Sequence, residues 1–380
     1  MPGIKPHTTS TFPVDILHHR ISGEAHLILS FTLRESTNWA AAGHEVAFGQ
    51  LQLQPPSSSL VHYRSLAVPD DLRPLVHLST PSKLAIRGQG GSAWVFDLAL
   101  GTLSSWVKDD VNLLSEPLSF ALYRALTDND RGGRFGQEWR ARRMHQIRTH
   151  PLTTKWGSRR ESGIAEVVAT TRVAAPVLNW SVVCTTTFRF SGRDVHIHVH
   201  AKPQGELLPG TFARFGIRLG LAGAERAKWF GRGPGEGYVD KKASQKMGNW
   251  EETIDGLFVD YEYPQDGGNR TDVRWVEFLG KVPKPEGQND ENGDAKKQTR
   301  LLRARFGNLD GASFQALHYG TEDLDETEHP YELYKRKRKD TVVHLDWAHH
   351  GIGTGSCGPA TLPQYELRTD QEFDYEILLD

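Results

Sequence analysis

The sequence predicts an all-β protein, a large antiparallel sandwich or supersandwich preceded by a partial β domain. Three observations lead to this prediction. Apolar residues recur at every second position in many short segments, which is the period of a half-buried strand. The 380 residues include 37 glycines and 20 prolines, typical of a turn-rich protein. The only segment with a pattern that favours a helix is short and lies within residues 136–147.

The first region covers residues 1–56. Two or three strands are expected there, too few for a stable sandwich alone. We therefore interpret the region as a partial immunoglobulin-like domain, or as strands that add to a partner. The cluster of prolines and serines at 55–59 predicts a boundary, and residues 57–84 are expected to be a linker. The alternating apolar positions are Leu27, Leu29, Phe31 and Leu33, followed by Val46, Phe48, Leu51 and Leu53.

The second region, residues 85–380, is expected to form the supersandwich. Residues 182–200 predict a hairpin that turns at Ser191–Gly192. Residues 281–299 contain no large apolar side chain after Val282, so an exposed and disordered loop is expected there. Further strands are expected around Trp94 to Leu98 and at 212–222, 273–279, 301–306, 312–319, 341–347 and 372–379.

Charge and composition exclude several classes of function. The 45 basic and 47 acidic side chains give a net charge of −2, which argues against nucleic acid or an anionic membrane as a partner. No apolar run reaches the ~18 residues of a membrane span, and no secretory signal is visible, so a cytoplasmic location is expected. The basic run 335–339 follows the acidic stretch 322–328, which favours a solvated, charge-compensated loop.

Metal and cofactor sites are not expected. Cys184 and Cys357 form no disulfide framework and no cysteine-based zinc site. His196, His198 and His200 alternate along one predicted strand, about 6.6 Å apart by strand rise, and three histidines can hold zinc. The favoured alternative has Val195, Ile197 and Val199 facing the core and the histidines facing solvent, because no fourth ligand is marked by spacing.

Two loops carry polar residues in a pattern that suits either structure or binding. Residues 229–240 read WFGRGPGEGYVD, but a dinucleotide loop would require glycine where Glu236 stands, and Pro234 lacks an N–H. We expect a tight loop whose carboxylates, Glu236 and Asp240, are structural or bind sugar. Residues 127–134, TDNDRGGR, predict a turn held by side chains, or a site for a sugar or a cation.

Taken in order, five stretches resemble the C-terminal part of family 2 glycoside hydrolase β-galactosidases. A sixth, NWAAAGHEVA at 38–47, is similar to the end of that family's fourth, immunoglobulin-like domain. The five stretches are TDNDRG at 127–132, WFGRGPGEGYVD at 229–240, PQDGGNRTDVRW at 264–275, HPYEL at 329–333 and GIGTGSCGP at 351–359.

The resemblance implies the family's fifth domain, the β-galactosidase small chain, with a fold similar to galactose mutarotase. It also implies a β-galactoside as the sugar and a large catalytic chain as partner, with self-association as the alternative. The family's two catalytic glutamates belong to a (β/α)₈ barrel that this sequence does not encode, so no catalytic residue is expected here. By resemblance, the residues beside the substrate are Asp128, Asn129, Asp130, Gly132 and Cys357.

The sequence departs from the family pattern at several positions. Cys357 stands where an aromatic residue is frequent, Lys241 where arginine is common, and Asp266–Gly267 where Glu-Asn is usual. Two other functions stay open. The chain could be an autonomous mutarotase-like, sugar-binding enzyme that uses its own concave sheet, or a non-catalytic structural remnant.

Overall fold

The computed structural model describes residue 5 and residues 7–13, 23–56, 74–89, 91–108, 111–159, 164–281, 298–308 and 310–380. The chain divides into two compact units, Met1–Ser57 and Ser58–Asp380. Most of the described elements are antiparallel strands, as the sequence predicts. None of the helices in these ranges is long and apolar enough to cross a membrane.

The first unit contains one antiparallel hairpin, β1 (Ala25–Thr32) and β2 (Glu45–Gln54). A sheet of two strands buries apolar side chains poorly, because each face has only two rows of side chains. Several large apolar residues of this unit are consequently exposed to solvent. They are Ile28, Phe31, Trp39, Val46, Leu51 and Leu53.

The second unit is built on a nine-stranded antiparallel sheet. The expected hairpin at 182–200 is present as β11 and β12, and its turn contains Gly192 with φ of +52°, a value that glycine adopts readily. The strands, in spatial order, are β15 (Lys246–Thr253), β14 (Ala224–Gly233), β17 (Trp275–Gly280), β18 (Thr299–Phe306), β21 (Phe373–Leu379), β12 (Asp194–Gln204), β11 (Ser181–Ser191), β10 (Ile164–Ala174) and β9 (Arg148–Arg159). The last strand along the chain, β21, therefore lies inside the sheet.

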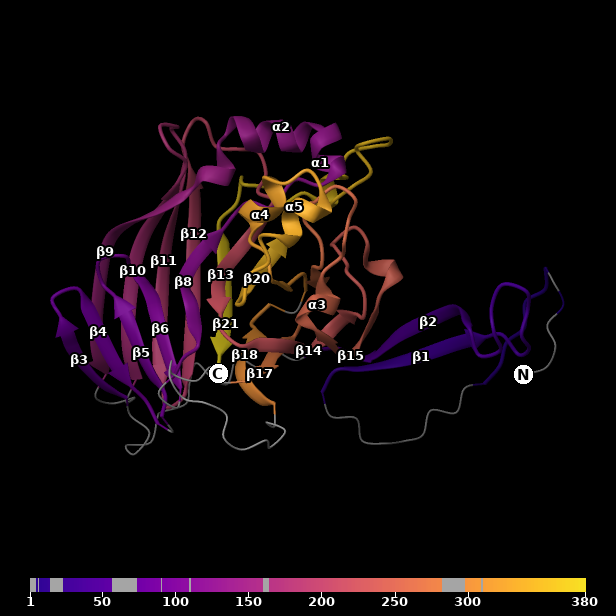
Figure 1. Cartoon of the computed structure of the whole chain (residues 1–380), viewed down its shortest axis with the longest axis horizontal. Helices are drawn as coiled ribbons and strands as arrows, with labels where there is room; N and C mark the ends of the chain where they lie inside the picture. The colour runs from indigo at the N-terminus through magenta and orange to yellow at the C-terminus, as the bar shows by residue number, and fades with distance from the viewer. Residues whose placement is uncertain are drawn as a thin grey trace. The chain divides into compact units, whose positions relative to one another are not determined.

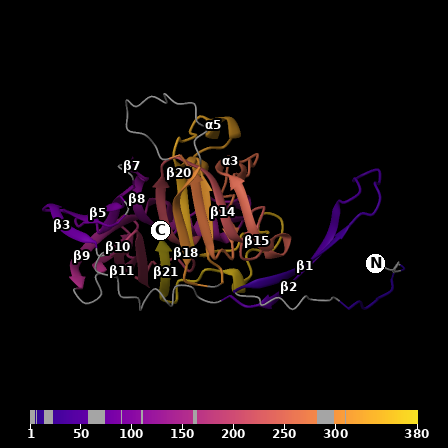
Figure 2. The same ribbon diagram turned by 90° about the horizontal axis from the view of Figure 1, so that it is seen from below.

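Two five-stranded sheets complete this unit. One runs β16 (Arg270–Thr271), β19 (Ser313–Leu317), β20 (Thr341–His349), β13 (Arg214–Leu221) and β8 (Leu114–Ala121). The other runs β3 (Leu75–Thr80), β4 (Lys83–Arg87), β5 (Ala93–Asp97), β6 (Thr102–Lys108) and β7 (Val111–Asn112). Figure 2 shows this second sheet beside β9, β10 and β11.

One hydrophobic core joins the three sheets of the second unit. Alternate residues of β10 and β11 are buried, as the period of two requires. From β11, Phe188 and Phe190 contact Phe96 and Trp94 of β5, with ring centroids 5.0 and 5.5 Å apart. Phe215 of β13 stacks on Phe373 of β21 at 4.5 Å, which ties a five-stranded sheet to the nine-stranded one.

The helices are short. The expected helix within 136–147 is present as α2 (Arg134–Ala141) and the 3₁₀ turn η2 (Met144–Gln146). The prediction of a single helix was wrong, because one-turn helices are stabilised by caps and have no periodic pattern. The others are α1 (Asp128–Gly132), α3 (Ile254–Leu257), α4 (Thr321–Asp325), α5 (Pro330–Tyr334), η3 (Lys242–Ser244) and η4 (Pro363–Tyr365).

Two connecting segments were expected, a linker at 57–84 and a loop at 281–299. The range 57–84, expected to be a linker, contains β3 and the start of β4. Both strands are short and pair in a sheet, so neighbouring strands supply the order that so short a segment does not signal on its own. The rest of that range, 57–73, lies outside the described residues. The loop expected at 281–299 lies outside them as well, except for Lys281, Gln298 and Thr299.

Candidate functional site

The residues expected beside a sugar lie on α1 and on the glycine-rich loop 351–359, and these two segments meet at one end of the second unit (Figure 1). Asn129 makes the link. Its amide nitrogen donates to the carbonyl oxygens of Ile352 and Gly353, at 3.0 and 2.6 Å. Its amide oxygen accepts from the Ser356 hydroxyl at 2.8 Å. The side chain of Asn129 therefore fixes the position of the loop relative to the helix.

Gly132 allows this close approach. A Cβ atom at residue 132 would lie 2.8 Å from the Cα atom of Ser356, which is shorter than real Cβ contacts allow. Gly355 lies similarly near, since a Cβ there would be 3.0 Å from the carbonyl oxygen of Asn129. Glycine at these positions is thus a requirement of backbone packing between the two segments.

Asp240 holds the same loop from the other side. Its carboxylate accepts the backbone N–H groups of Ile352 at 3.1 Å and Gly353 at 2.6 Å. Gly353 has φ of +54°, a left-handed conformation that favours glycine. The loop is therefore clamped by the Asn129 amide through its carbonyls and by the Asp240 carboxylate through its N–H groups. Asp240, one of the two loop carboxylates expected to be structural or to bind sugar, thus has its hydrogen-bond partners in the backbone of this loop.

Asp130, one of the residues expected beside the substrate, does not face solvent. It is 2% exposed and pairs with Arg124, which is 0% exposed, through bonds of 3.0 and 2.8 Å. Its carboxylate also accepts the backbone N–H of Thr127, while the Thr127 hydroxyl accepts the N–H of Asp130, so the two residues form the capping box of α1.

Arg124 connects this pair to the loop. Its guanidinium donates to the carbonyl oxygens of His350 and Gly351, at 2.8 and 3.0 Å. Burial alone would lower the pKa of Arg124, but the charge and hydrogen bonds of Asp130 raise that pKa above its ordinary value. The arginine is therefore a fixed cation whose hydrogen bonds are used inside the protein.

Asp128 is the exposed carboxylate of α1. Its N–H donates to the side-chain oxygen of Gln265 at 2.9 Å, and its carboxylate lies 3.5 Å from the guanidinium of Arg131. Arg131 in turn lies over the ring of Tyr263, 4.1 Å from the centroid. The stretch 264–269 therefore borders α1, and Tyr263 presents a ring, 38% exposed, at this end of the unit.

Glu236, the other carboxylate of the glycine-rich stretch 229–240, is also engaged. It accepts the backbone N–H of Gly268 at 2.7 Å and the hydroxyl of Tyr261. Burial, and then the neighbouring Glu236, raise the pKa of Tyr261, so this phenol is the donor. Glu236 thereby connects the glycine-rich stretch 229–240 to the segment 261–268.

Cys357 lies at the apex of the loop. The N–H groups of Cys357 and Gly358 both donate to the carbonyl oxygen of Thr354, at 3.2 and 2.7 Å, and close a tight turn. The thiol is free and exposed. At this end of the described unit, Asp130, Glu236 and Asp240 thus have internal partners, and Asp128, Tyr263 and Cys357 present their side chains to solvent.

The histidine strand forms no zinc site in the described part of the chain, where no cluster of three or more His, Cys, Asp or Glu could hold a metal ion. Val195, Ile197 and Val199 face the core, as expected. His198 lies 3.0 Å from Asp374, and His200 lies 3.3 Å from Glu372. The expectation that all three histidines face solvent was wrong for His196, which is 2% exposed, whereas His198 and His200, further along the same strand, are partly exposed and exposed.

The basic run 335–339 begins at the end of α5, and three of its side chains pair with acidic residues, Arg336 within the stretch 322–328 and Lys337 and Arg338 outside it. Arg336 contacts Glu326 at 2.9 Å, Lys337 contacts Asp255 at 2.6 Å, and Arg338 contacts Asp340 at 2.8 Å.

Sequence reasoning missed Arg124, Gln265 and Tyr263. Arg124 lies three positions before the start of the TDNDRG stretch and pairs with it, but an isolated arginine in a strand-like segment gives no pattern. Gln265 and Tyr263 belong to or border the quoted stretch 264–275, so their proximity to α1 had a signal in the resemblance, but not in spacing.

Comparisons with known proteins agree on one group. Residues 88–379 match the family described as the β-galactosidase small chain, and residues 1–54 match domain 4 of β-galactosidase. The chain is 27% identical to a β-galactosidase of Kluyveromyces lactis over 391 residues, which cover 99% of this chain and 33% of that protein. It is 30% identical to a β-galactosidase of Arthrobacter sp. (strain B7), with 92% of this chain and 32% of that protein covered.

The chain therefore spans about a third of the length of the curated relatives it matches. Among solved structures, it resembles a galactose 1-epimerase from Lactobacillus acidophilus NCFM at 11% identity and a TM-score of 0.35, covering 81% of this chain and 97% of that one. It also resembles a galactose mutarotase-like protein from Clostridium acetobutylicum at 8% identity and a TM-score of 0.38, covering 82% and 99%.

Proposed function

The chain belongs to the β-galactosidase small-chain family, and from that premise we propose that it shapes the sugar site of a β-galactosidase whose catalytic carboxylates come from another polypeptide. The reaction is the hydrolysis of terminal β-galactosyl residues. The proposal is supported above all by the end of the second unit where α1 meets the loop 351–359. Four of the five stretches that resemble the family converge there through hydrogen bonds.

The state of the carboxylates at this end supports a shaping role over a catalytic one. A retaining glycosidase requires two carboxyl groups about 5 Å apart that can reach one glycosidic bond. Asp130 is committed to Arg124, Asp240 to two backbone N–H groups, and Glu236 to Tyr261 and Gly268. A carboxylate held in this way cannot exchange its partner for substrate without loosening the loop.

The exposed groups give this end its proposed contacts. Tyr263 offers a ring for the apolar face of a sugar, and Asp128 offers a carboxylate that can accept sugar hydroxyls. Cys357 offers a smaller and softer apolar surface than an aromatic ring at the loop apex, so a wider pocket is expected.

The exposed hairpin of the first unit supports the proposal that a partner chain binds there. Its hairpin exposes Trp39 at 64% and Leu51 at 57%, and a two-stranded sheet in water is marginal without further strands. We propose that a large β-galactosidase chain supplies the missing strands, with self-association as the alternative outcome.

Hydrolysis of a chromogenic β-galactoside tests the proposal. The purified chain alone should show negligible turnover, and adding a large chain that carries the family 2 barrel should produce activity and a complex on size-exclusion chromatography. Turnover by the chain alone that is lost when one of its own carboxylates is changed would refute the proposal. So would a strictly monomeric chain that ignores the large chain at high concentration.

A further inference from the structure

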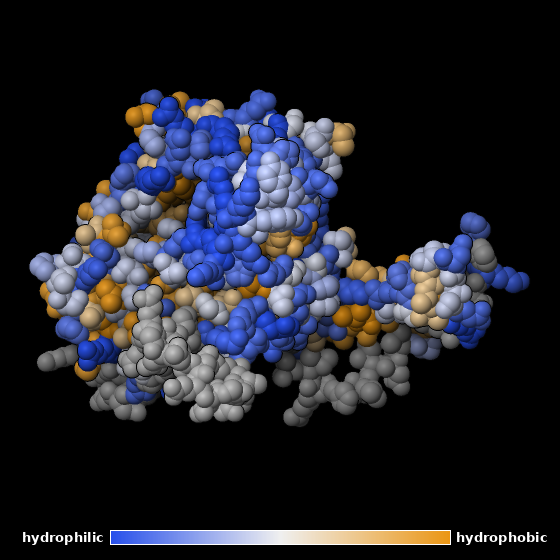
Figure 3. Space-filling model, viewed as in Figure 1, coloured by the Kyte–Doolittle hydropathy of each residue, from blue (hydrophilic) through white to orange (hydrophobic). Residues whose placement is uncertain are grey.

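A cavity of about 900 Å³ lies in the second unit, away from the loop end. It opens between the edge strand β8 and the buried face of β10, β11 and β12, with η2 and α4 at its rim. Figure 3 shows the surface hollowed below the α2–η2 segment, with apolar side chains in its depth. No residue of α1 or of the loop 351–359 lines this cavity.

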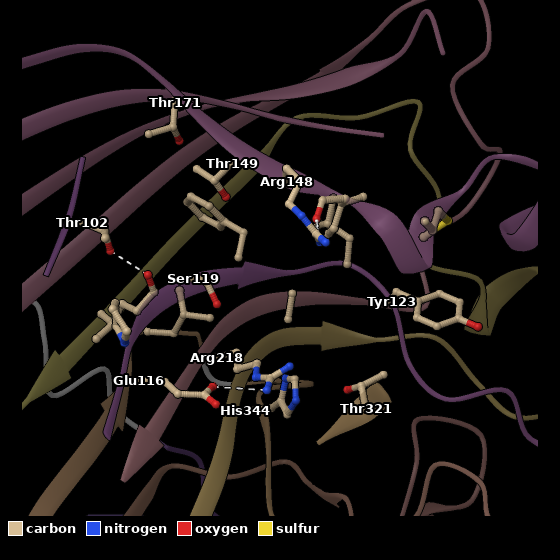
Figure 4. A pocket seen from close by; sticks show the side chains of 18 of the residues that line it. Thr102, Glu116, Ser119, Tyr123, Arg148, Thr149, Thr171, Arg218, Thr321 and His344 are labelled. Atoms are coloured by element: carbon tan, nitrogen blue, oxygen red, sulfur yellow. Dashed lines mark hydrogen bonds and ion pairs between the residues drawn. The ribbon is translucent and has the colours of Figure 1, made fainter. Parts of the chain in front are cut away.

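Three buried polar groups in the wall of the cavity have no hydrogen-bond partner. Two are the hydroxyls of Thr171 and Thr186, which are 2% and 4% exposed on neighbouring strands. The third is Nδ1 of His344, on β20 across the cavity and 3% exposed. Figure 4 shows Thr171 on one wall and His344 on the wall opposite. Buried polar atoms nearly always have a partner, so three such atoms around one space leave hydrogen-bonding capacity that a ligand takes up when these side chains rotate towards it.

The remaining wall suits a ligand with apolar and polar faces. Phe188, Ile197 and Ile217 line the floor, and Phe120 lies beside them on β8. Sugars have such faces, since their C–H groups pack on apolar side chains and their hydroxyls both donate and accept. A neutral histidine and two threonine hydroxyls can likewise donate and accept.

The charged groups at the rim argue against an ionic ligand. Glu116 and Glu322 both contact Arg218, at 3.2 and 2.8 Å, and Asp325 contacts Arg140 at 2.7 Å. Burial first, and the nearby arginines Arg214 and Arg218 second, lower the pKa of His344, so the imidazole is neutral at pH 7. The carboxylates that line this cavity are also poorly placed as a general base, because arginines hold them; the geometry therefore points to binding rather than catalysis.

We propose that this cavity binds a neutral, hydroxyl-rich ligand of monosaccharide or disaccharide size, with Thr171, Thr186 and His344 as its hydrogen-bonding residues. Its volume falls within the range of about 300–1,000 Å³ that is common for small-molecule pockets. The site belongs to this chain alone and does not require a large chain, so it can be tested separately from the function proposed above.

The test titrates the full chain with D-galactose, D-glucose and lactose, by calorimetry and by ligand-detected NMR. The key variant is the double change Thr171→Val and Thr186→Val, which removes two orphaned hydroxyls and keeps the side-chain shape. Its matched control is Thr170→Val with Thr185→Val, a cross-strand pair on the opposite face of the same two strands. A third variant, Ser119→Trp, places a large side chain at a pocket-lining position that is exposed in the empty cavity.

At least one sugar should bind to the unmodified chain, and the Thr171/Thr186 variant should weaken that binding about tenfold. The Thr170/Thr185 control should bind as the unmodified chain does, and Ser119→Trp should abolish binding. The proposal is overturned when none of the three sugars binds at concentrations up to about 100 mM. It is equally overturned when a sugar binds but Ser119→Trp leaves its affinity unchanged, or when both threonine pairs have the same effect.

Discussion

The loop end and the cavity of the second unit use buried polar groups in opposite ways. At the loop end, Arg124 and Asp130 bond to each other. Arg124 and Asp240 also form hydrogen bonds with the backbone of residues 350–353. In the cavity, Thr171, Thr186 and His344 have polar atoms without a partner. At the loop end the hydrogen bonds fix the protein's own backbone, whereas in the cavity three polar atoms keep bonding capacity that no other described residue uses.

The largest loss of stability is expected when the Asp130 carboxylate is removed. Asp130→Ala leaves the Arg124 guanidinium buried without its carboxylate, and we expect the free energy of unfolding to fall by about 3–5 kcal/mol. Asp128→Ala, on the same helix but exposed, should change it by about 0.5 kcal/mol or less. Denaturant titrations of both variants measure the difference. Equal effects would mean that the Arg124–Asp130 pair does not hold the loop end together.

A smaller effect is expected from adding one methyl group. Gly132→Ala places a Cβ against the backbone of Ser356, so either the loop or α1 must shift, at a cost of about 1–3 kcal/mol. Gly157→Ala is the matched control, because a Cβ at Gly157 meets nothing within 4 Å. Thermal unfolding gives the stability of each variant, and protease cleavage within 354–359 reports loosening of the loop. If Gly132→Ala is as stable and as protected as Gly157→Ala, the two segments are not tightly packed.

The pH dependence of stability tests whether His344 is neutral in the folded protein. The folded-state pKa of this histidine lies well below its ordinary value, so the unfolded chain binds a proton that the folded chain does not. The stability that this neutral histidine contributes is therefore present above the unfolded pKa of about 6.5 and is lost as the pH falls below it. His344→Gln should reduce the slope of unfolding free energy against pH between 5 and 6.5 by about one proton.

The non-titrating variant His344→Phe provides the control for that slope. Both variants should lose the same part of it, even where their absolute stabilities differ, because the effect depends on the proton and not on packing. Denaturant midpoints across this pH range provide the measurement. An unchanged slope in both would show that His344 is protonated in the folded protein.

The smallest changes in stability are expected for three threonine-to-valine variants. Thr127→Val removes the cap of α1 and should lower stability by about 1 kcal/mol. Thr171→Val and Thr186→Val remove hydroxyls that have no partner, so stability should stay unchanged or rise by up to about 1 kcal/mol. Calorimetric melting of the three single variants measures the stability change at each position. Losses of similar size at all three positions would show that the cavity hydroxyls have internal partners in solution.

The strand pattern was the part of the fold that the sequence predicted well. The hairpin at 182–200 follows from alternation on both sides of Ser191–Gly192, because a half-buried strand imposes a period of two on its residues. Helix α1 was not predicted, since its stability comes from the Thr127–Asp130 capping box and the Arg124 pair, and not from a repeated apolar face. Strand β3 was taken for linker, because its order comes from pairing with β4.

The two candidate sites differ in how far the sequence could predict them. The meeting of residues 128–132 with 356–359 followed from resemblance, since their separation along the chain gives no local signal. A sugar site on the chain's own concave sheet was one of the alternatives that the sequence left open, but the residues that line the cavity could not be predicted. Thr171 and Thr186 occupy buried positions of alternating strands, where a threonine looks like any core residue, and His344 joins them only through tertiary packing.

The inner position of β21 has a consequence for how the protein is made on the ribosome. This strand pairs with β12 on one side and with β18 on the other, yet it comes last along the chain. Until residues 373–379 have left the exit tunnel, both of these strands present an open edge that can recruit another nascent chain. We expect synthesis itself to contain a vulnerable interval, in which holding chaperones improve the yield more than they do for a protein whose first strand is central.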